Sequence, residues 1–337
     1  MKRVLFIAKK GQKYSGAYGY AASSGLLNSA TFVVEMLNNR GVDAKFVHVV
    51  DNNDIDREVT QHRPDVVIIE ALWVTPSKFD VLTQLHPNVQ WVVRVHSEVP
   101  FLAQEGMAMQ WLFGYLNRTN VFVAFNSQRA LHDFTRVSWS DKLLYLPNYF
   151  PEHKMLPRKD KSEDLHVGCF GAIRPLKNQL MQAMSAIRYA DLEHKHLKFH
   201  MNTTRVEGGE EVLKNIRGLF YDSPHYLVEH EWLHHSRFQH LLSHMDFAMC
   251  VSLSETFCIV AADAVALGIP LVCSPEVPWS SKMSQADSTS MDSILDALYR
   301  VGRLRRISGY LNRCGLKEYN SRSVEVWLQF SRNNPRL

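Results

Sequence analysis

The sequence predicts an α/β protein built from two domains, each with a parallel sheet. Short runs of β-branched and aromatic residues alternate with segments of helical periodicity along the chain, and this alternation is typical of parallel strands joined by crossover helices. It restarts after a proline-bounded stretch at residues 147–151, which indicates a linker. A chain of 337 residues is long enough for two such domains.

The expected strands are short apolar runs, and the expected helices are longer segments with apolar residues three and four positions apart. In the first half we expect strands at 3–8, 44–49, 65–70, 90–95, 121–125 and 143–146, and helices at 26–40, 77–85, 105–117 and 127–135. In the second half we expect strands at 166–170, 196–201, 226–229, 246–251 and 270–273, and helices at 177–190, 209–220, 236–243 and 256–267.

The composition is that of a soluble globular protein, with 46% hydrophobic and 21% charged residues. The apolar run at residues 4–8 is too short for the core of a signal peptide or for a membrane span. The five cysteines show no C-x-x-C spacing, which favours reduced thiols in a cytosolic protein. We therefore expect a cytoplasmic protein that does not insert into a membrane.

Charge is distributed unevenly along the chain, although the net charge is only +4. Residues 298–337 hold nine basic and two acidic residues, and residues 1–13 hold five basic residues and no acid. Such stretches form solvated helix faces or attract anionic partners such as phosphate or nucleic acid. The sequence leaves both interpretations open.

Two carboxylates, Glu255 and Asp263, lie eight positions apart in the mostly apolar segment 254–270. A buried strand at 248–252 precedes them, and a helix is expected from about residue 257 to 267. Glu255 therefore lies just before a helix N-terminus, where backbone N–H groups favour an anion. Asp263 lies about two turns into the helix, within roughly 80° of the same direction. The pair suits one extended ligand, and the alternative is a capping Glu with a surface Asp.

A second group of residues, Gly171, Arg174 and Lys177, follows a predicted strand and leads into a helix. A glycine lets the backbone approach a ligand, and the two cations can neutralise a diphosphate. The segment is neither a Walker motif nor a G-x-G-x-x-G motif. The alternative is a solvated turn with ordinary surface cations.

The first domain offers two further candidate segments. His96 and Glu98 follow a predicted strand, where a histidine is either structural or catalytic. A long loop at residues 9–22 leads into the first long helix, and long loops inside compact domains are often functional. Candidate residues at the start of that helix are Ser24, Gly25 and Asn28.

Taken in chain order, these segments resemble the GT-B glycosyltransferases, most closely the retaining enzymes of family four. That family carries Glu-x7-Glu after a buried strand, and Glu255 and Asp263 match the spacing, with Asp in place of the second Glu. Gly171 and Lys177 match its Gly-Arg…Lys segment, in which Arg174 is displaced along the chain. The Pro147-Asn148 pair and the strand-end histidine, His96, match two further motifs, so the resemblance spans nearly the whole chain.

The resemblance implies two Rossmann-like domains facing across a cleft. Residues 1–148 would bind the acceptor, residues 149–315 would bind a nucleotide sugar, and a helix at 316–337 would return to the first domain. It also implies transfer with retention from a UDP- or GDP-sugar, with no cofactor. No metal site is expected, because His240 and His244 on one predicted helix lack an evident third ligand.

The resemblance also assigns roles to residues. Glu255 would contact sugar hydroxyls and support positive charge at the anomeric carbon, and Asp263 would hold the ribose. Arg174 and Lys177 would stabilise the leaving diphosphate, and His96 would touch the sugar. Further donor-binding residues would be Thr256, Phe257, Gly171, Asn202, Trp232 and Leu233. Acceptor-binding residues would be Ser24, Gly25, Asn28 and Glu98.

The acceptor is the open part of the prediction. Family members glycosylate saccharides, lipids, small molecules, proteins and, in tailed phages, hydroxymethylated DNA bases. The basic stretches suit a polyanion, and Tyr14, Tyr18 and Tyr20 suit stacking on a base. We therefore hypothesise transfer to a 5-hydroxymethylpyrimidine in DNA, in the cytoplasm of the host if the protein is viral. Alternatives are a polysaccharide or other saccharide acceptor, a sugar-nucleotide epimerase, and a binding protein without turnover.

Overall fold

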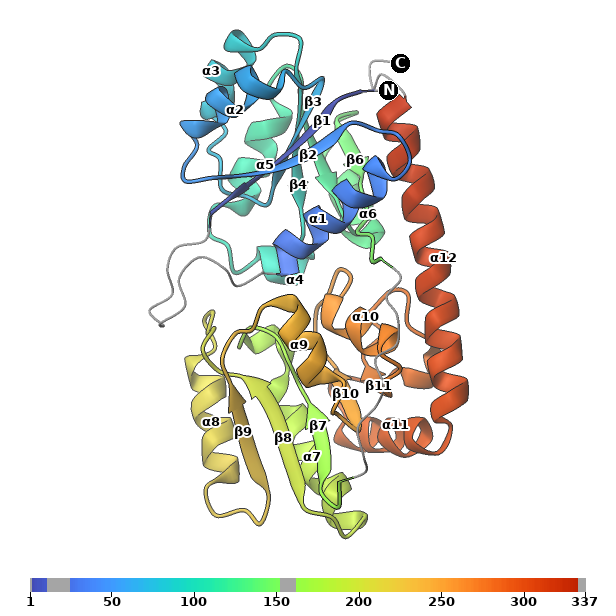
Figure 1. The fold of residues 1–337 in the computed structure, drawn as a ribbon. Coiled ribbons are helices and arrows are strands. Elements are labelled where there is room, and N and C mark those ends of the chain that lie inside the picture. Colours follow the sequence, from blue (N-terminus) through green and yellow to red (C-terminus); the bar gives the residue numbers. More distant parts are fainter. Residues whose placement is uncertain (1, 11–24, 152–161, 333–337) are drawn as a thin grey trace. The chain divides into compact units, whose positions relative to one another are not determined.

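The computed structural model describes residues 2–10, 25–151 and 162–332. The predicted stacking residues Tyr14, Tyr18 and Tyr20 and the candidate Ser24 lie outside these residues. The chain forms two compact units (Figure 1). The first unit holds residues 2–10, 25–151 and 319–332. The second unit holds residues 162–318.

The first unit is built on a parallel sheet with the strand order β2-β1-β3-β4-β5-β6. Its strands are β1 (Val4–Lys9), β2 (Ala44–Val49), β3 (Val66–Glu70), β4 (Gln90–Val95), β5 (Val121–Phe125) and β6 (Leu143–Tyr145). Its helices are α1 (Gly25–Asn38), α2 (Asp54–His62), α3 (Lys78–Leu85), α4 (Val99–Leu102), α5 (Ala108–Leu116) and α6 (Gln128–Val137).

Helices cover both faces of this sheet, which explains why its strands read as continuous apolar runs. Side chains of α2, α3, α5 and α6 pack with one set of strand residues, including Ile7 and Val67. Side chains of α1 pack on the other face with Val4 and Phe6. Figure 1 shows this layered arrangement.

The second unit is built on a parallel sheet with the order β11-β10-β7-β8-β9. Its strands are β7 (Leu165–Gly168), β8 (Leu197–Asn202), β9 (Tyr226–His230), β10 (Phe247–Cys250) and β11 (Leu271–Cys273). Its helices are α7 (Gln179–Leu192), α8 (Glu210–Phe220), α9 (His235–Leu242), α10 (Ile259–Ala266) and α11 (Met291–Arg303), with short 3₁₀ turns η1 (Pro175–Lys177) and η2 (Lys282–Ser284).

The last helix, α12 (Arg305–Arg332), begins in the second unit and ends in the first. Trp327 of α12 is fully buried among residues of the first unit. Its ring lies 5.6 Å from the ring of Phe6, and its Nε1 donates to the carbonyl of Pro147 at 2.8 Å. The expected Rossmann-like sheets and the return of the last helix to the first domain are both confirmed.

Candidate functional site

The strand order of the second unit reverses between β7 and β10, because β8 and β9 extend the sheet on one side and β11 on the other. Ligands of such sheets bind beyond the carboxyl ends of the strands at this switch point. The segment after β7 carries Gly171, Arg174 and Lys177, and the segment after β10 carries Glu255. The fold therefore brings together two segments that the sequence analysis had singled out separately.

Lys177 and Glu255 form an ion pair between these two segments, with Nζ in contact with Oε1. The hydroxyl of Ser252 donates to the same carboxylate oxygen at 3.0 Å. Burial by itself lowers the pKa of the Lys177 ammonium, but the neighbouring Glu255 carboxylate outweighs it and raises that pKa above its usual value. The Lys177 side chain keeps 23% of its surface exposed and Glu255 keeps 11%. A ligand can therefore reach a firmly protonated lysine and a carboxylate together.

Gly171 allows the turn after β7. Its φ of +123° is one that residues with a Cβ rarely adopt. Its N–H donates to Oδ1 of Asn202 at 3.3 Å, and Nδ2 of Asn202 donates to the carbonyl of Glu231 at 3.0 Å. Asn202 is buried, so its amide fixes the loops after β7 and β9 relative to each other.

Asp263 lies in α10 and is only 1% exposed, so the alternative of a surface aspartate is wrong. Its Oδ1 accepts hydrogen bonds from His235 and Gln239 of α9, each at 2.8 Å. Its Oδ2 is buried and has no hydrogen-bond partner among the described residues. An unsatisfied buried acceptor costs about 1–3 kcal/mol, and a hydroxyl donated by a ligand would remove that cost.

Arg174 is paired with a carboxylate that the sequence analysis did not single out. Its guanidinium contacts Glu207, with Nε 2.5 Å from Oε2, and Nε of Arg205 lies 2.5 Å from Oε1 of the same residue. Burial would raise the pKa of Glu207, but the two guanidinium groups hold it below its usual value. The Arg205 guanidinium also lies 4.6 Å from the ring centroid of Trp232. Binding of a phosphate by Arg174 would therefore replace the Glu207 carboxylate as its partner.

The loop between Glu255 and α10 buries the side chains of Phe257 and Cys258. The helix begins at Ile259, two to three residues later than expected, after Cys258 in the left-handed conformation with φ 62°. The side chain of Phe257 is 1% exposed, and its carbonyl accepts a hydrogen bond from Nε1 of Trp279 at 2.8 Å. Any contact of Phe257 with a donor therefore involves its backbone and not its ring.

In the first unit the strand order reverses between β1 and β3, the second place where a ligand site is expected. Glu70 ends β3, and His96 follows β4. Nε2 of His96 contacts Oε2 of Glu70, and Nδ2 of Asn126 lies 3.4 Å from Nδ1 of His96. His96 was expected at this strand end from the sequence, whereas Glu70 was not.

A buried guanidinium, that of Arg94, holds this carboxylate. Arg94 and Glu70 are both fully buried, with Nη1 of Arg94 3.1 Å from Oε1 of Glu70. Arg94 also donates to the carbonyls of Leu146 and Pro147 at 2.9 Å each, and to Oδ1 of Asn148 at 2.6 Å. The sequence did carry a signal for this pair, because the apolar strands VVIIE and QWVVRV each contain one charged residue. Buried charges are usually paired.

The neighbouring charges of Glu70 and Arg94 determine the protonation state of His96. Burial would raise the pKa of Glu70, but Arg94 and the hydrogen bond from His96 keep it below its usual value. Burial, together with repulsion by Arg94, holds the pKa of His96 below its usual value despite the attraction of Glu70. Since an ionised carboxylate only accepts hydrogen bonds, neutral His96 donates its Nε2–H to Glu70, and Nδ1 is its acceptor nitrogen.

The predicted acceptor-binding residues lie in two parts of the first unit, after β4 and at the start of α1. Glu98 is 3% exposed. Its carboxylate accepts a hydrogen bond from Ser127 and lies 3.3 Å from Nη2 of Arg129. Gly25 and Asn28 lie in the first turn of α1, beside Ser29, whose hydroxyl donates to Asn148 at 2.6 Å.

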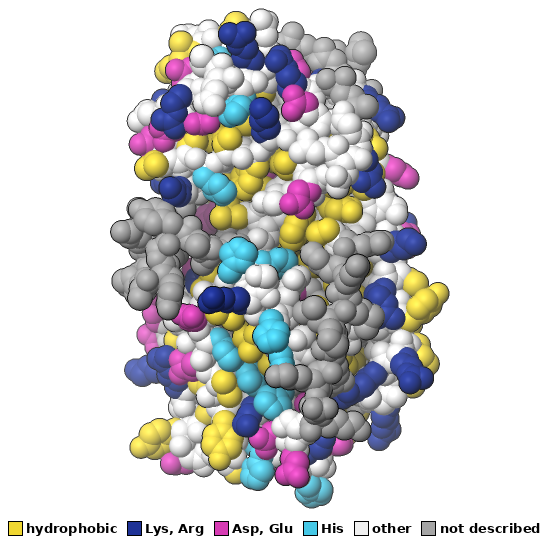
Figure 2. Space-filling model, viewed as in Figure 1, with side chains coloured by type: hydrophobic (Ala, Val, Ile, Leu, Met, Phe, Trp, Pro, Cys, Tyr) yellow, Lys and Arg dark blue, Asp and Glu magenta, His cyan; other side chains and the backbone are white. Residues whose placement is uncertain are grey.

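A row of imidazoles crosses the second sheet beside the candidate site. Nδ1 of His166 lies 3.0 Å from Nε2 of His200, and Nδ1 of His200 lies 2.9 Å from Nε2 of His230. Burial, reinforced by these neighbours, lowers the pKa of His200 to about 3, and burial also lowers the pKa of His166 and of His230. Figure 2 shows histidine side chains gathered on this face of the second unit. The row is therefore uncharged at neutral pH.

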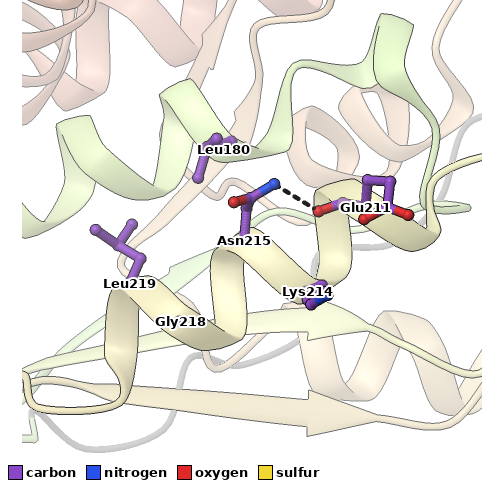
Figure 3. Close-up of a pocket in the computed structure, with 6 residues that line it drawn as sticks. All are labelled: Leu180, Glu211, Lys214, Asn215, Gly218 and Leu219. Carbon is purple, nitrogen blue, oxygen red and sulfur yellow. Dashed lines mark hydrogen bonds between the residues drawn. The ribbon is translucent and has the colours of Figure 1, made fainter.

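A pocket elsewhere in the second unit lies between α7 and α8 (Figure 3). It contains none of the predicted site residues, and the one hydrogen bond drawn in it joins Asn215 to the carbonyl of Glu211 within α8. Its lining residues are Leu180, Glu211, Lys214, Asn215, Gly218 and Leu219. It gives no reason to move the candidate site from the switch point.

The described part of the chain shows neither a metal-binding group of side chains nor a membrane-spanning helix. Within residues 2–10, 25–151 and 162–332, no three His, Cys, Asp or Glu side chains are grouped as a metal ion would require. No helix in that part of the chain is both long enough and apolar enough to cross a bilayer.

Comparison with known proteins identifies the fold. No family model and no curated protein matches the chain. Sucrose-phosphate synthase from Thermosynechococcus elongatus superposes with a TM-score of 0.69 at 13% identity, over 98% of each chain. HepE from Anabaena, solved in complex with UDP and glucose, gives 0.64 at 14% identity, over 98% of this chain and 99% of HepE. The chain has the GT-B fold.

A third neighbour is longer than this chain. TarM from S. aureus, solved in a complex that includes UDP, gives a TM-score of 0.60 at 14% identity. The match covers 80% of this chain and 55% of TarM, so the chain spans about half the length of that protein. At identities this low, the superpositions establish the common fold and nothing more. Activity has to be argued from the residues of this chain.

Proposed function

We propose that the chain is a glycosyltransferase that moves a sugar from a UDP-sugar to a hydroxyl acceptor with retention of anomeric configuration. The observation that carries the proposal is the pairing of Lys177 with Glu255 at the switch point of the second unit. Two neighbours of the same fold, HepE and TarM, were solved with UDP. GDP is the alternative donor nucleotide.

The donor would lie along the segment from Glu255 to Asp263. The unsatisfied Oδ2 of Asp263 would accept a hydrogen bond from a ribose hydroxyl. The backbone N–H groups of Thr256 and Phe257, ahead of α10, would bind the diphosphate with Lys177. Arg174 would join them by exchanging its contact with Glu207 for one with the diphosphate. The remaining donor-binding candidates, which surround the loops after β7 and β9, are Gly171, Asn202, Trp232 and Leu233.

The chemistry follows from these charges. The bond between the anomeric carbon and the diphosphate oxygen breaks, and its electron pair leaves with UDP. Lys177 stabilises the charge that develops on the diphosphate more strongly in the transition state than in the bound donor. Glu255 faces the positive charge that develops at the anomeric carbon. The acceptor oxygen forms the new bond and passes its proton to an oxygen of the departing diphosphate. This scheme uses no metal ion.

The first domain would bind the acceptor, with His96 beside the reacting sugar and Gly25, Asn28 and Glu98 around it. We extend the proposal to residues 1–148 for the acceptor, 149–315 for the donor and 316–337 for the returning segment. The helix itself begins earlier than expected, at Arg305. The five cysteines are all free, which supports a cytoplasmic location.

The acceptor that we propose is a 5-hydroxymethylpyrimidine base in DNA, of the phage type. The support is the group of five basic residues, with no acid, in residues 1–13, which suits a polyanion. A saccharide acceptor is the second candidate, and the fold shared with a sucrose-phosphate synthase favours it.

One experiment tests donor and acceptor together. UDP- and GDP-hexoses and pentoses are offered with DNA that contains 5-hydroxymethylcytosine and, separately, with a saccharide mixture, and products are identified by mass spectrometry. A nucleoside heavier by one sugar supports the DNA acceptor, and a lengthened saccharide replaces it by the second candidate. Conversion of the donor without any acceptor points to an epimerase. Donor binding with neither hydrolysis nor transfer contradicts the enzyme proposal.

A further inference from the structure

The first part of α12, which belongs to the second unit, exposes an apolar stripe. Ile307, Tyr310 and Leu311 are 50%, 61% and 38% exposed, and Cys314 is exposed one turn further on. We call these four residues the α12 stripe. Their spacing of three, four and seven positions places them on one side of a helix. The helix meets its own unit through another side, where Ser308, Asn312 and Leu316 are buried.

Basic residues border this stripe. Residues 303–318 contain five basic residues and one acid, Glu318. At about 100° per residue, Arg306, Arg313 and Lys317 fall along one edge of the α12 stripe, and all three are exposed. Figure 2 shows hydrophobic and basic side chains next to one another along this part of α12.

This combination matches one kind of surface. Single exposed apolar residues are normal in soluble proteins, but four on one helical stripe with a cationic edge are typical of helices that lie on anionic membranes. The apolar side chains enter the boundary between headgroups and acyl chains, while arginine and lysine bind the anionic headgroups. We propose that the α12 stripe and its basic edge dock the protein on an anionic lipid surface.

Two other occupants fit the surface less well. A second copy of the chain, packed stripe against stripe, would bring two arginine-bearing edges together with only Glu318 in each segment to oppose them, and like charges at an interface are unfavourable. A nucleic acid would use the cations but leave the apolar stripe without a role, because phosphate contacts carry such binding. The proposal concerns a surface outside the candidate sugar site and does not depend on the proposed activity.

Vesicle co-sedimentation of the full chain tests the proposal. Vesicles of phosphatidylcholine with phosphatidylglycerol are compared with vesicles of phosphatidylcholine alone. We expect the wild type to bind the anionic vesicles at least tenfold more tightly, with affinity falling as salt rises. Ile307→Asp with Leu311→Asp should reduce binding at least tenfold, and Arg306→Glu with Arg313→Glu should do the same. A matched control is Lys195→Glu with Lys214→Glu, which makes the same charge change at exposed positions of the same unit and should lower binding much less.

A second readout uses the native cysteines. Cys314 lies in the α12 stripe and is exposed, whereas the other four cysteines are buried. A thiol-reactive, polarity-sensitive fluorophore will therefore label Cys314, and its emission should shift to the blue with anionic vesicles and stay unchanged with phosphatidylcholine alone.

Three results would overturn the docking proposal. The first is absence of binding to anionic vesicles by the wild type, and the second is binding that survives the Ile307→Asp and Leu311→Asp changes. The third is a dimer, seen by sedimentation velocity, that these changes dissociate, because it would assign the α12 stripe to a second copy. Circular dichroism of each variant checks that it is folded.

Discussion

Removal of the Arg94 guanidinium should destabilise the first unit severely. Arg94→Met keeps the length of the side chain but leaves the Glu70 carboxylate buried without its cation. Breaking a buried ion pair by removing one partner costs about 3–5 kcal/mol. The carbonyl of Leu146 loses its donor as well, and the carbonyl of Pro147 keeps only the hydrogen bond from Trp327. We therefore expect a loss within or above that range in the free energy of unfolding of this unit.

Guanidinium chloride unfolding, followed by circular dichroism and tryptophan fluorescence, measures this loss. Arg118→Met is the matched control, because its ion pair with Asp80 lies at the surface of the same unit and should cost less than about 1 kcal/mol. The double change Glu70→Leu with Arg94→Met should recover at least about 1–2 kcal/mol relative to the sum of the single changes, since a well-packed apolar pair can replace a buried ion pair. A loss below about 1 kcal/mol for Arg94→Met would refute this reasoning.

Three further predictions concern the second unit. The pKa of His200 is lowered to about 3 in the folded state and is about 6.5 in the unfolded chain. The contribution of neutral His200 to the free energy of unfolding is therefore present above about pH 6.5 and is lost as the pH falls, by about 2 kcal/mol at pH 5. His200→Gln should make the free energy of unfolding, measured in urea titrations at several pH values, depend less on pH. Lys177→Ala should lower the transfer rate on the order of 100-fold with unchanged circular dichroism, and a rate near wild type would remove Lys177 from the site. Asp263→Asn replaces one carboxylate oxygen by an NH2 group, which cannot accept a hydrogen bond. It should raise the KM for the donor at least tenfold, and an unchanged KM would exclude the ribose contact.

Local patterns were enough to predict most of the fold. The strands of both units lie within two residues of their expected ends, because buried parallel strands are continuous apolar runs. Helix α2, with sequence DIDREVTQH, was missed because only Ile55 and Val59 of it are buried. Helices α4 and α11 were not predicted either.

The candidate site was predictable only in part, for a physical reason. Gly171, Lys177 and Glu255 were found because each belongs to a strand followed by a turn, which is a local signal. The carboxylates Glu70 and Glu207 were missed because their partners, Arg94 and Arg174, lie 24 and 33 positions away. The pairing of residues so far apart is decided by the order of strands in the sheet, which the sequence alone does not state.

Calorimetric titration with UDP tests the central claim most directly. The account predicts that the wild type binds UDP at one site, that Lys177→Ala and Asp263→Asn each weaken binding at least tenfold, and that Lys195→Ala leaves it unchanged. Absence of binding of both UDP and GDP, the alternative donor nucleotide, or binding that neither site variant alters, would contradict a nucleotide-sugar site at the switch point of the second unit.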